Sequence, residues 1–177
     1  GGSGPLGALG YVAAAKELMY QADEMGLTID RVVVASGSGG THAGLVAGLT
    51  GLSSGARVLG VSTRAEKAAQ EAKILDLARR TAELAGSAVE VRPADVEVVD
   101  RYVGPGYSLP TDAMVEAVRL FARLEGVLLD PVYTGKVAAG LVDMVRRGEL
   151  GADEDVVFVH TGGWPALFAY QDLFWGA

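Results

Sequence analysis

The chain has 177 residues, of which 50% are hydrophobic and 21% are charged, and its formal net charge is −7. This composition is typical of one globular domain and argues against a disordered chain. The acidic charge without a basic stripe excludes tracking of a nucleic-acid backbone, no apolar run reaches membrane-spanning length, and the lack of cysteine favours the cytoplasm.

The first half of the chain alternates between helix-like and strand-like segments. Residues 31–36 read RVVVAS, a mostly apolar, β-branched run that is typical of a strand covered on both faces. Residues 65–86 place charged and apolar side chains on different faces, as a surface helix does. In chain order we expect a helix over 8–26, a strand over 31–36, a helix over 41–52, a strand over 57–63 and a helix over 65–86.

The second half begins with an irregular stretch and then returns to the same alternation. Residues 89–111 are expected to be irregular because they contain three prolines, which break regular backbone hydrogen bonding. We then expect helices over 112–126 and 136–148 and a strand that leads into a second glycine turn over 155–163. Strands separated by helices predict a single α/β domain over residues 1–177, with a parallel sheet and helices on both faces.

A glycine-rich loop, SGSGGTHAG, follows the strand over 31–36 and precedes a helix. Successive glycines allow backbone N–H groups to point into one concavity, and the following helix adds the positive end of its dipole. In α/β sheets, ligands bind beyond the carboxyl ends of the strands, where this loop lies. A phosphate site is therefore expected here, although a turn needed only for packing would read the same way. The candidate residues are Ser36, Gly37, Ser38, Gly39, Gly40 and Thr41.

The spacing of these glycines argues against two nucleotide motifs. In the dinucleotide fingerprint the third glycine comes three residues after the second, whereas here Gly40 is followed by Gly44. A nucleoside-triphosphate loop ends in Gly-Lys-Ser/Thr, whereas Gly135 and Lys136 are followed by Val137.

Several longer segments resemble one branch of the pyridoxal-phosphate enzymes. GGSGPLGALGYV, VVVASGSGGTHAGL, GPGYSLP, EAVRLFARLEGVLLDPVYTGK and VFVHTGGWPALFAY occur in the order seen in that branch, across residues 1–170. The branch contains D-cysteine desulfhydrase and 1-aminocyclopropane-1-carboxylate deaminase. The resemblance implies fold type II, in which this chain would form most of the large, cofactor-binding domain of a tryptophan synthase β-like fold. It also implies pyridoxal 5'-phosphate as the cofactor.

The resemblance assigns roles to individual residues. The loop from Gly37 to Thr41 matches the cup for the cofactor phosphate. Tyr107 in GPGYSLP and Tyr133 in DPVYTGK match two active-site tyrosines beside the substrate. Thr134 occupies the position where the deaminases carry a glutamate beside the pyridine nitrogen, and Thr161 in HTGG lies where a hydroxyl can reach the same nitrogen.

The replacement of glutamate by Thr134 has a chemical consequence. A carboxylate keeps the pyridine nitrogen protonated and makes the ring a strong electron sink, whereas a neutral hydroxyl gives a weaker one. A weaker sink is sufficient when the β-carbon bears a good leaving group such as a thiolate, so Thr134 and Thr161 favour β-elimination over opening of a cyclopropane ring. As alternatives, Thr134 only caps the next helix, and the two tyrosines only satisfy their hydroxyls in the core.

The lysine that forms the Schiff base with the cofactor is not evident. Lys16, Lys67 and Lys73 lie on charged helix segments and are expected to be solvated, while Lys136 is near the site but does not match the family's Schiff-base position. The family's GGNK-like and SNH segments do not occur here. We therefore expect the C-terminal half of a longer enzyme, or a natural truncation. By itself the chain would be inactive and dependent on the missing N-terminal segment, and a half-fold would expose an apolar edge.

The predicted function is elimination of D-cysteine, a small amino-acid substrate, to pyruvate, ammonia and sulfide. The alternatives are an L-cysteate sulfo-lyase, a 1-aminocyclopropane-1-carboxylate deaminase, and, in another class, a non-catalytic module that binds a phosphorylated ligand. Substrate and stereochemistry stay open, and a homodimer is expected by resemblance. His42, inside a helix start, and His160, at the end of a buried strand, are interpreted as structural, and no metal site is expected.

Overall fold

Four parallel strands form the sheet in the computed structural model, which describes residues 2–175. Their order across the sheet is β3-β2-β1-β4, so the first strand of the chain lies inside the sheet. Every neighbouring pair is parallel, as expected for strands joined through helices. The strands are β1 (Arg31–Ser36), β2 (Arg57–Ser62), β3 (Glu97–Val99) and β4 (Val156–Phe158).

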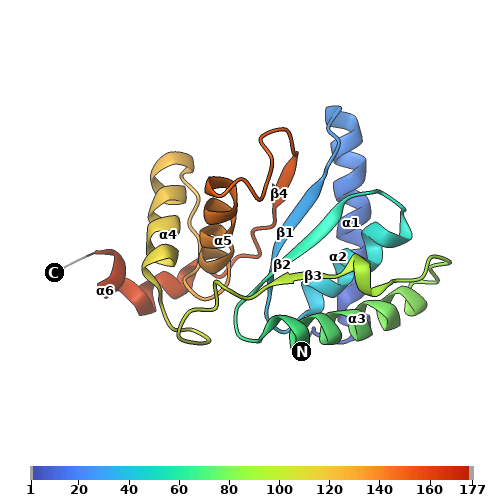
Figure 1. The fold of residues 1–177 in the computed structure, drawn as a ribbon, viewed down its shortest axis with the longest axis horizontal. Helices are drawn as coiled ribbons and strands as arrows, with labels where there is room; N and C mark the ends of the chain where they lie inside the picture. The colour runs from blue at the N-terminus through green and yellow to red at the C-terminus, as the bar shows by residue number, and fades with distance from the viewer. Residues whose placement is uncertain (1, 176–177) are drawn as a thin grey trace.

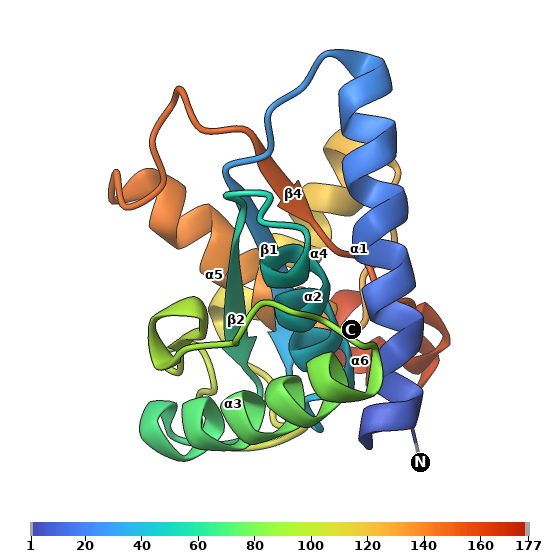
Figure 2. The same cartoon turned by 90° about the vertical axis from the view of Figure 1, so that its right-hand side faces the viewer.

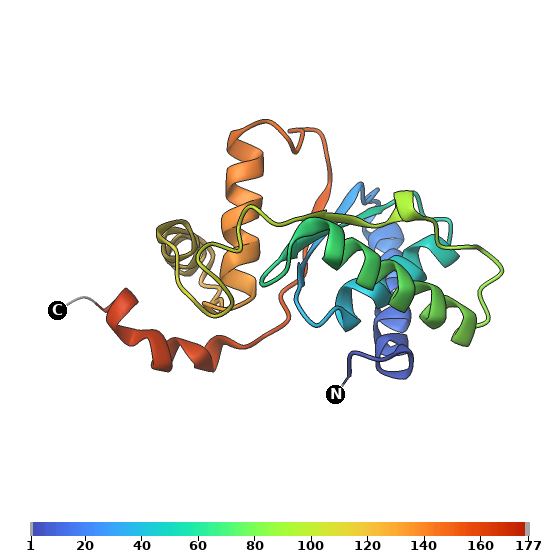
Figure 3. The same ribbon diagram turned by 60° about the horizontal axis from the view of Figure 1, so that its bottom comes forward.

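Helices cover both faces of this sheet, as the sequence predicts (Figure 1). One face is covered by α1 (Pro5–Met25), α2 (Gly40–Gly51) and α3 (Lys67–Leu84), which lie in front of the sheet in Figure 2. On the other face α5 (Thr134–Arg146) packs on the sheet and α4 (Asp112–Glu125) packs on α5 (Figure 3). The short elements are η1 (Pro93–Asp95), η2 (Trp164–Tyr170) and α6 (Gln171–Phe174). No helix within residues 2–175 is long and apolar enough to cross a membrane.

The two helical layers bury opposite sides of the same strands. Val32 and Val34 of β1 belong to the core beneath α1, α2 and α3, whereas Val33 packs on the α5 side with Val137 and Met144. This alternation follows from the two-residue period of a strand. It explains why β1 reads as a continuous apolar run.

Two glycines of α2 allow it to pack closely on α1. A Cβ atom at Gly44 would lie 2.4 Å from the carbonyl oxygen of Ala8, and one at Gly48 would lie 2.6 Å from Cβ of Ala15. A larger side chain at either position would push the helices apart.

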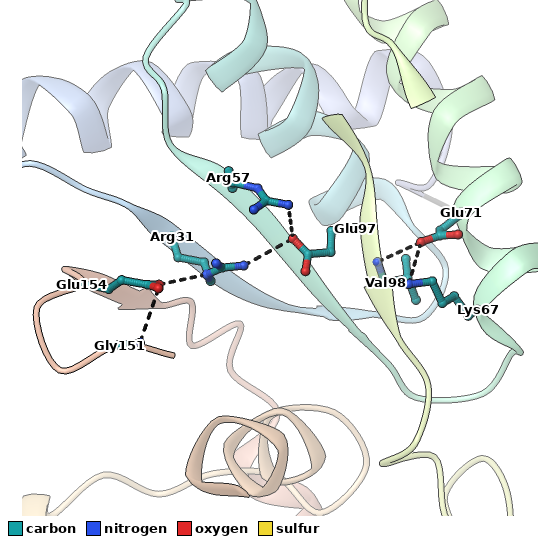
Figure 4. Close-up of polar contacts among 8 residues, drawn as sticks. All are labelled: Arg31, Arg57, Lys67, Glu71, Glu97, Val98, Gly151 and Glu154. Atoms are coloured by element: carbon teal, nitrogen blue, oxygen red, sulfur yellow. Dashed lines mark hydrogen bonds and ion pairs between the residues drawn. The ribbon is translucent and has the colours of Figure 1, made fainter. Parts of the chain in front are cut away.

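The irregular prediction for residues 89–111 is partly wrong, because it missed strand β3. The strand is only three residues long, too short for a clear alternation to stand out between the prolines. β3 lies at one edge of the sheet, and its Val98 N–H donates to Oε1 of Glu71 at 3.3 Å (Figure 4). A charged side chain on an edge N–H group discourages pairing with another chain.

An ion-pair network joins the amino ends of three strands (Figure 4). Arg31 and Arg57 are direct neighbours in the β1–β2 register, and Oε2 of Glu97 accepts hydrogen bonds from both, at 3.3 and 3.0 Å. Arg31 Nε also donates to Oε2 of Glu154 at 3.1 Å. The glutamates therefore offset the repulsion between the two arginines. This network lies at the end of the sheet opposite to the glycine loop.

Candidate active site

A cavity of about 320 Å³ opens at the carboxyl ends of β1 and β4. These ends of the strands point downwards in Figure 1. The cavity is where the two glycine turns of the sequence come together. The lining residues are Tyr11, Ala35, Gly37, Ser38, Gly39, Thr41, Tyr133, Thr161, Gly162 and Gly163. The topology therefore brings together residues that are more than 120 positions apart in the chain.

The glycine loop leaves backbone donors free at this cavity. Helix α2 begins at Gly40, and the N–H groups of Gly39, Gly40 and Thr41 find no acceptor within residues 2–175; of these residues, Gly39 and Thr41 line the cavity. Such orphan donors, together with the helix dipole, form an anion-binding site when they face a cavity. Ser38 and Thr41 add hydroxyl groups to the lining.

A side chain at either of two loop glycines would strain the backbone or crowd the neighbouring side chains. Gly39 has φ of 102°, which L side chains rarely adopt, and a Cβ atom there would lie 2.9 Å from Cδ1 of Ile74. A Cβ atom at Gly37 would lie 3.0 Å from Oγ1 of Thr63 and 3.2 Å from the Tyr133 ring. The loop thus closes against the helix layer on one side and the tyrosine on the other.

Ser36 is placed differently from the prediction, which counted its hydroxyl among the phosphate donors. The residue is fully buried, with Oγ 2.9 Å from Nδ1 of His42 and 2.9 Å from Nε2 of Gln70. Because successive strand residues point to opposite faces, Ala35 lines the cavity while Ser36 faces the α2–α3 layer.

The two predicted tyrosines meet at the cavity. Tyr133 lines it, and the hydroxyl of Tyr107 is hydrogen-bonded to that of Tyr133. The guanidinium of Arg64 lies 5.7 Å from the centre of the Tyr107 ring, a cation–π contact. The hydrogen bond with Tyr107, together with burial, raises the pKa of Tyr133 to about 12, although the charge of Arg64 acts in the opposite direction. Tyr133 therefore keeps its proton at neutral pH.

Asp130 positions Tyr133, a role that the sequence analysis missed. Its carboxylate is 2% exposed and accepts hydrogen bonds from the N–H groups of Val132, Tyr133 and Thr134 at 2.7–2.8 Å. These N–H groups belong to the start of α5 and would otherwise be unpaired. The Asp-Pro dipeptide at 130–131 was the available signal, because such a pair favours a turn.

Lys136 holds the loop that carries Tyr107. Its side chain is fully buried, and Nζ donates to the carbonyl oxygens of Val103 at 2.6 Å and Gly106 at 2.8 Å. Burial lowers the pKa of this amine. The amine is thus committed to the loop and is not among the groups that line the cavity.

Lys73 is not simply solvated, as the sequence led us to expect. Its Nζ donates to the carbonyl oxygen of Gly37 at 3.3 Å, so it braces the outer side of the glycine loop. Lys16 and Lys67 are exposed on their helices, as predicted. None of the four lysines therefore presents its amine to the cavity.

The two threonines differ in burial and in hydrogen bonding. Thr134 is fully buried, donates to Oδ1 of Asp130 at 2.7 Å and accepts from the N–H of Asp130 at 2.8 Å. Both bonds lie within the turn before α5, which argues against the predicted role beside the cofactor ring. Thr161, in contrast, is exposed at the cavity.

His160 braces the turn that contains Thr161. Its Nδ1 accepts from the N–H of Gly162 at 2.9 Å, so Nε2 carries the proton that is shared with the carbonyl oxygen of Leu128, also at 2.9 Å. The expectation that His160 ends a buried strand is wrong, because β4 ends at Phe158 and His160 is exposed. Within residues 2–175 no cluster of three or more His, Cys, Asp or Glu could hold a metal ion.

These observations fit the phosphate end of pyridoxal phosphate, but not its covalent attachment. The free N–H groups of the glycine loop match an anion, and Thr161 adds a hydroxyl-bearing residue to the lining of the same cavity. A lysine amine directed into the cavity is lacking among the described residues. The described residues thus form a pocket suited to a phosphate group, with no lysine amine among its lining.

This chain belongs to the pyridoxal-phosphate dependent enzyme family, whose model matches residues 1–162. The tryptophan synthase β-like fold and the cofactor class implied by the sequence are thereby confirmed. It is 48% identical over 171 residues to the D-cysteine desulfhydrases of Salmonella typhi and Salmonella newport. Each match covers 97% of this chain and 51% of the relative, so the chain spans about half the length of these curated relatives.

Solved structures agree with this assignment. A crystal structure of an ACC deaminase homologue matches with a TM-score of 0.85 and 42% identity, over 96% of this chain and 50% of that one. A fungal L-serine ammonia-lyase from Rhizomucor miehei matches with a TM-score of 0.60 and 21% identity, over 94% of this chain and 55% of that one. The second likeness supports the fold alone.

Proposed function

We propose that this chain is the C-terminal half of a D-cysteine desulfhydrase, the part that binds the cofactor phosphate and places two tyrosines beside the substrate. The reaction takes D-cysteine and water to pyruvate, ammonia and hydrogen sulfide. The cavity at the carboxyl ends of β1 and β4 carries the proposal, because it combines free backbone donors with paired tyrosine hydroxyls. The 48% identity to D-cysteine desulfhydrases supports the substrate.

In this proposal the phosphate binds to the backbone N–H groups of the loop from Ser38 to Thr41, with hydroxyls of Ser38 and Thr41 as additional donors. The start of α2 contributes its dipole, which favours a negatively charged group. When bound, pyridoxal phosphate supplies the electron sink that makes loss of the β-substituent feasible. The chain's own contribution is to orient the ring by holding its tail.

The tyrosine pair has a separate part in the proposal. Because the pKa of Tyr133 is about 12, its Oη keeps its proton at neutral pH and can donate a hydrogen bond to a departing thiolate. Tyr107 is hydrogen-bonded to this hydroxyl and helps to fix its direction. A donor of this kind must contact the group that it stabilises, and Tyr133 lines the cavity.

Ring-opening deamination is the second candidate, since an ACC deaminase homologue is a structural relative. None of the described residues lining the cavity carries a carboxylate, and Thr161 is the hydroxyl that can approach the pyridine nitrogen. Uncharged surroundings favour elimination of a good leaving group. Activity assays separate the two, since D-cysteine yields sulfide and pyruvate whereas ring opening yields 2-oxobutanoate.

A titration of the chain with pyridoxal phosphate tests the binding step. We expect saturable binding that inorganic phosphate competes away, no visible band from a lysine Schiff base, and no sulfide release from D-cysteine. The longer gene product, if sequence upstream of Gly1 encodes a lysine-bearing segment, is expected to release sulfide. Binding without sulfide release in that longer protein would favour the alternative of a phosphate-binding module.

The proposal also includes a cytoplasmic homodimer. Several large apolar side chains are exposed, such as Leu124 at 71%, Phe168 at 67% and Trp175 at 63%. Large apolar side chains exposed in one chain are often covered where protein chains associate. Light scattering of the purified chain measures its assembly state, and a monomer at all concentrations would contradict the dimer.

A further inference from the structure

The carbonyl group of Gly37 is held by two side chains from α3. Gln70 Nε2 donates to its oxygen at 3.0 Å, and Lys73 Nζ donates to it at 3.3 Å. Gln70 is 1% exposed, so its bond is shielded from water. The two donors are three residues apart on α3 and therefore lie on the same face of the helix. Together they determine which way the Gly37–Ser38 peptide group is turned.

The direction of that carbonyl determines the direction of the next N–H group. In a trans peptide the C=O and the following N–H point in opposite directions, and the described residues contain no cis peptide. With the Gly37 carbonyl turned towards α3, the N–H of Ser38 points away from α3. Gly37 and Ser38 both line the cavity, whereas Gln70 does not.

Gln70 is itself oriented by a buried polar chain. One of its Nε2 protons goes to Gly37 and the other to Oγ of Ser36, which lies 2.9 Å from Nδ1 of His42. Burial lowers the pKa of His42 to about 4, so the ring is neutral at pH 7 and Nδ1 can accept the Ser36 proton. Both protons of the amide are therefore used, and a carboxylate in its place would have none to offer.

We propose that Gln70 is a positioning residue for the phosphate site, which fixes the Gly37–Ser38 peptide so that the Ser38 N–H faces the anion. The identity of the anion rests on the proposed function. The orientation of the loop does not depend on it. Lys73 assists from the outer side and adds positive charge near the loop. The buried Ser36, which the sequence assigned to the phosphate, acts through Gln70 instead.

The test compares Gln70→Met and Gln70→Glu in the 177-residue chain. Methionine keeps the length of the side chain without its donors, whereas glutamate places a carboxylate against the Gly37 carbonyl. Gln21→Met and Gln21→Glu are the matched controls, because Gln21 also donates a hydrogen bond, to Glu17 at 3.1 Å, but on an exposed face of α1. Circular dichroism reports whether each variant is folded.

Two measurements are made on each variant. Nitrogen-15 relaxation without ligand reports the order of the Ser38 N–H, and calorimetry reports the affinity for inorganic phosphate and for pyridoxal phosphate. We expect Gln70→Met to lower the order of Ser38 and to weaken both ligands about tenfold, the effect of one lost buried hydrogen bond. The Gln21 variants are expected to match the wild type.

The outcomes separate the two proposals. Unchanged Ser38 order and unchanged affinity in Gln70→Met would overturn the positioning role. Failure of the wild type to bind either ligand would overturn the proposed function, while a loss of Ser38 order confined to the Gln70 variants would still support the positioning role. If both Gln70 variants unfold, Lys73→Met decides, with Lys67→Met as control: a fall in Ser38 order supports the inference, and no change contradicts it.

Discussion

The rings of Tyr107 and Tyr133 meet edge to face, with their centres 5.9 Å apart and their planes inclined by 62°. A different buried group holds each of them. Asp130 accepts the N–H of Tyr133 at 2.8 Å, and Lys136 binds two carbonyl groups just before Tyr107. Because Lys136 follows Tyr133 by three residues on α5, the start of one helix positions both hydroxyls.

Replacing Tyr107 by phenylalanine should lower the pKa of Tyr133 from about 12 towards its ordinary value of 10, because the hydrogen bond is the largest cause of the shift. A pKa raised in the folded state stabilises the protein below pH 10, and that contribution is lost as pH rises towards 12. Ultraviolet absorbance titration, with Tyr133→Phe to identify the signal, measures the change. An identical Tyr133 titration in both proteins would refute the coupling.

Lys136→Met is expected to release the loop that carries Tyr107. Methionine fills similar space but leaves the Val103 and Gly106 carbonyls without their donor, at a cost of about 2 kcal/mol in unfolding free energy. Urea unfolding measures the loss, and the exposed Lys16→Met serves as control. We also expect the Tyr133 pKa to fall as it does in Tyr107→Phe, and a stable variant with an unchanged Tyr133 pKa would contradict this role.

Valine substitutions at Thr134 and Thr161 should have different effects, one on the free energy of unfolding and the other on ligand binding. Thr134→Val removes two buried hydrogen bonds to Asp130 and should lower the unfolding free energy by about 1–3 kcal/mol. Thr161→Val should change stability by less than about 0.5 kcal/mol, because the residue is exposed. We expect only Thr161→Val to weaken pyridoxal phosphate binding selectively. If Thr134→Val weakens it without loss of stability, the original ring-facing role of Thr134 is restored.

His42 should make the stability of the chain sensitive to acid. Burial lowers its pKa from 6.5 to about 4, so the unfolded state binds a proton first as pH falls. The stability is fully present above pH 6.5 and decreases down to about pH 4, by about 3 kcal/mol at about 1.4 kcal/mol per pKa unit. Urea unfolding of wild type and His42→Asn between pH 7.5 and 4.5 isolates this contribution. The surface variant His160→Asn is the control, and parallel pH profiles for wild type and His42→Asn would disprove the prediction.

Much of the fold could be predicted from local patterns. The run RVVVAS became β1 with the predicted bounds, because four consecutive apolar residues can only be buried between two layers. The glycine loop also predicts a helix start with free N–H donors, because successive glycines between a strand-like and a helix-like run are a local pattern. β3 was missed because a strand of three residues carries almost no periodic signal.

The side-chain assignments depended on contacts that local patterns do not encode. Thr134 and Ser36 both carry hydroxyls at positions that seemed right for the cofactor, yet each hydroxyl is used by a buried neighbour. The sequence predicts a solvated Lys73, whereas the packing of α3 beside the glycine loop brings its amine to the Gly37 carbonyl. In each case the partner is set by how elements pack.

By itself, the sequence determined the alternation of strands and helices, the glycine turn with its free N–H groups, and the family to which the chain belongs. Those features follow from side-chain period, backbone freedom and motif order, all of which are local. Only the tertiary structure decided which hydroxyls face the cavity, that Asp130 and Lys136 position the tyrosines, and that Gln70 turns the Gly37 carbonyl. Hydrogen-bond partners in a buried site come from distant segments, so their choice exists only once the sheet and its two helical layers have packed.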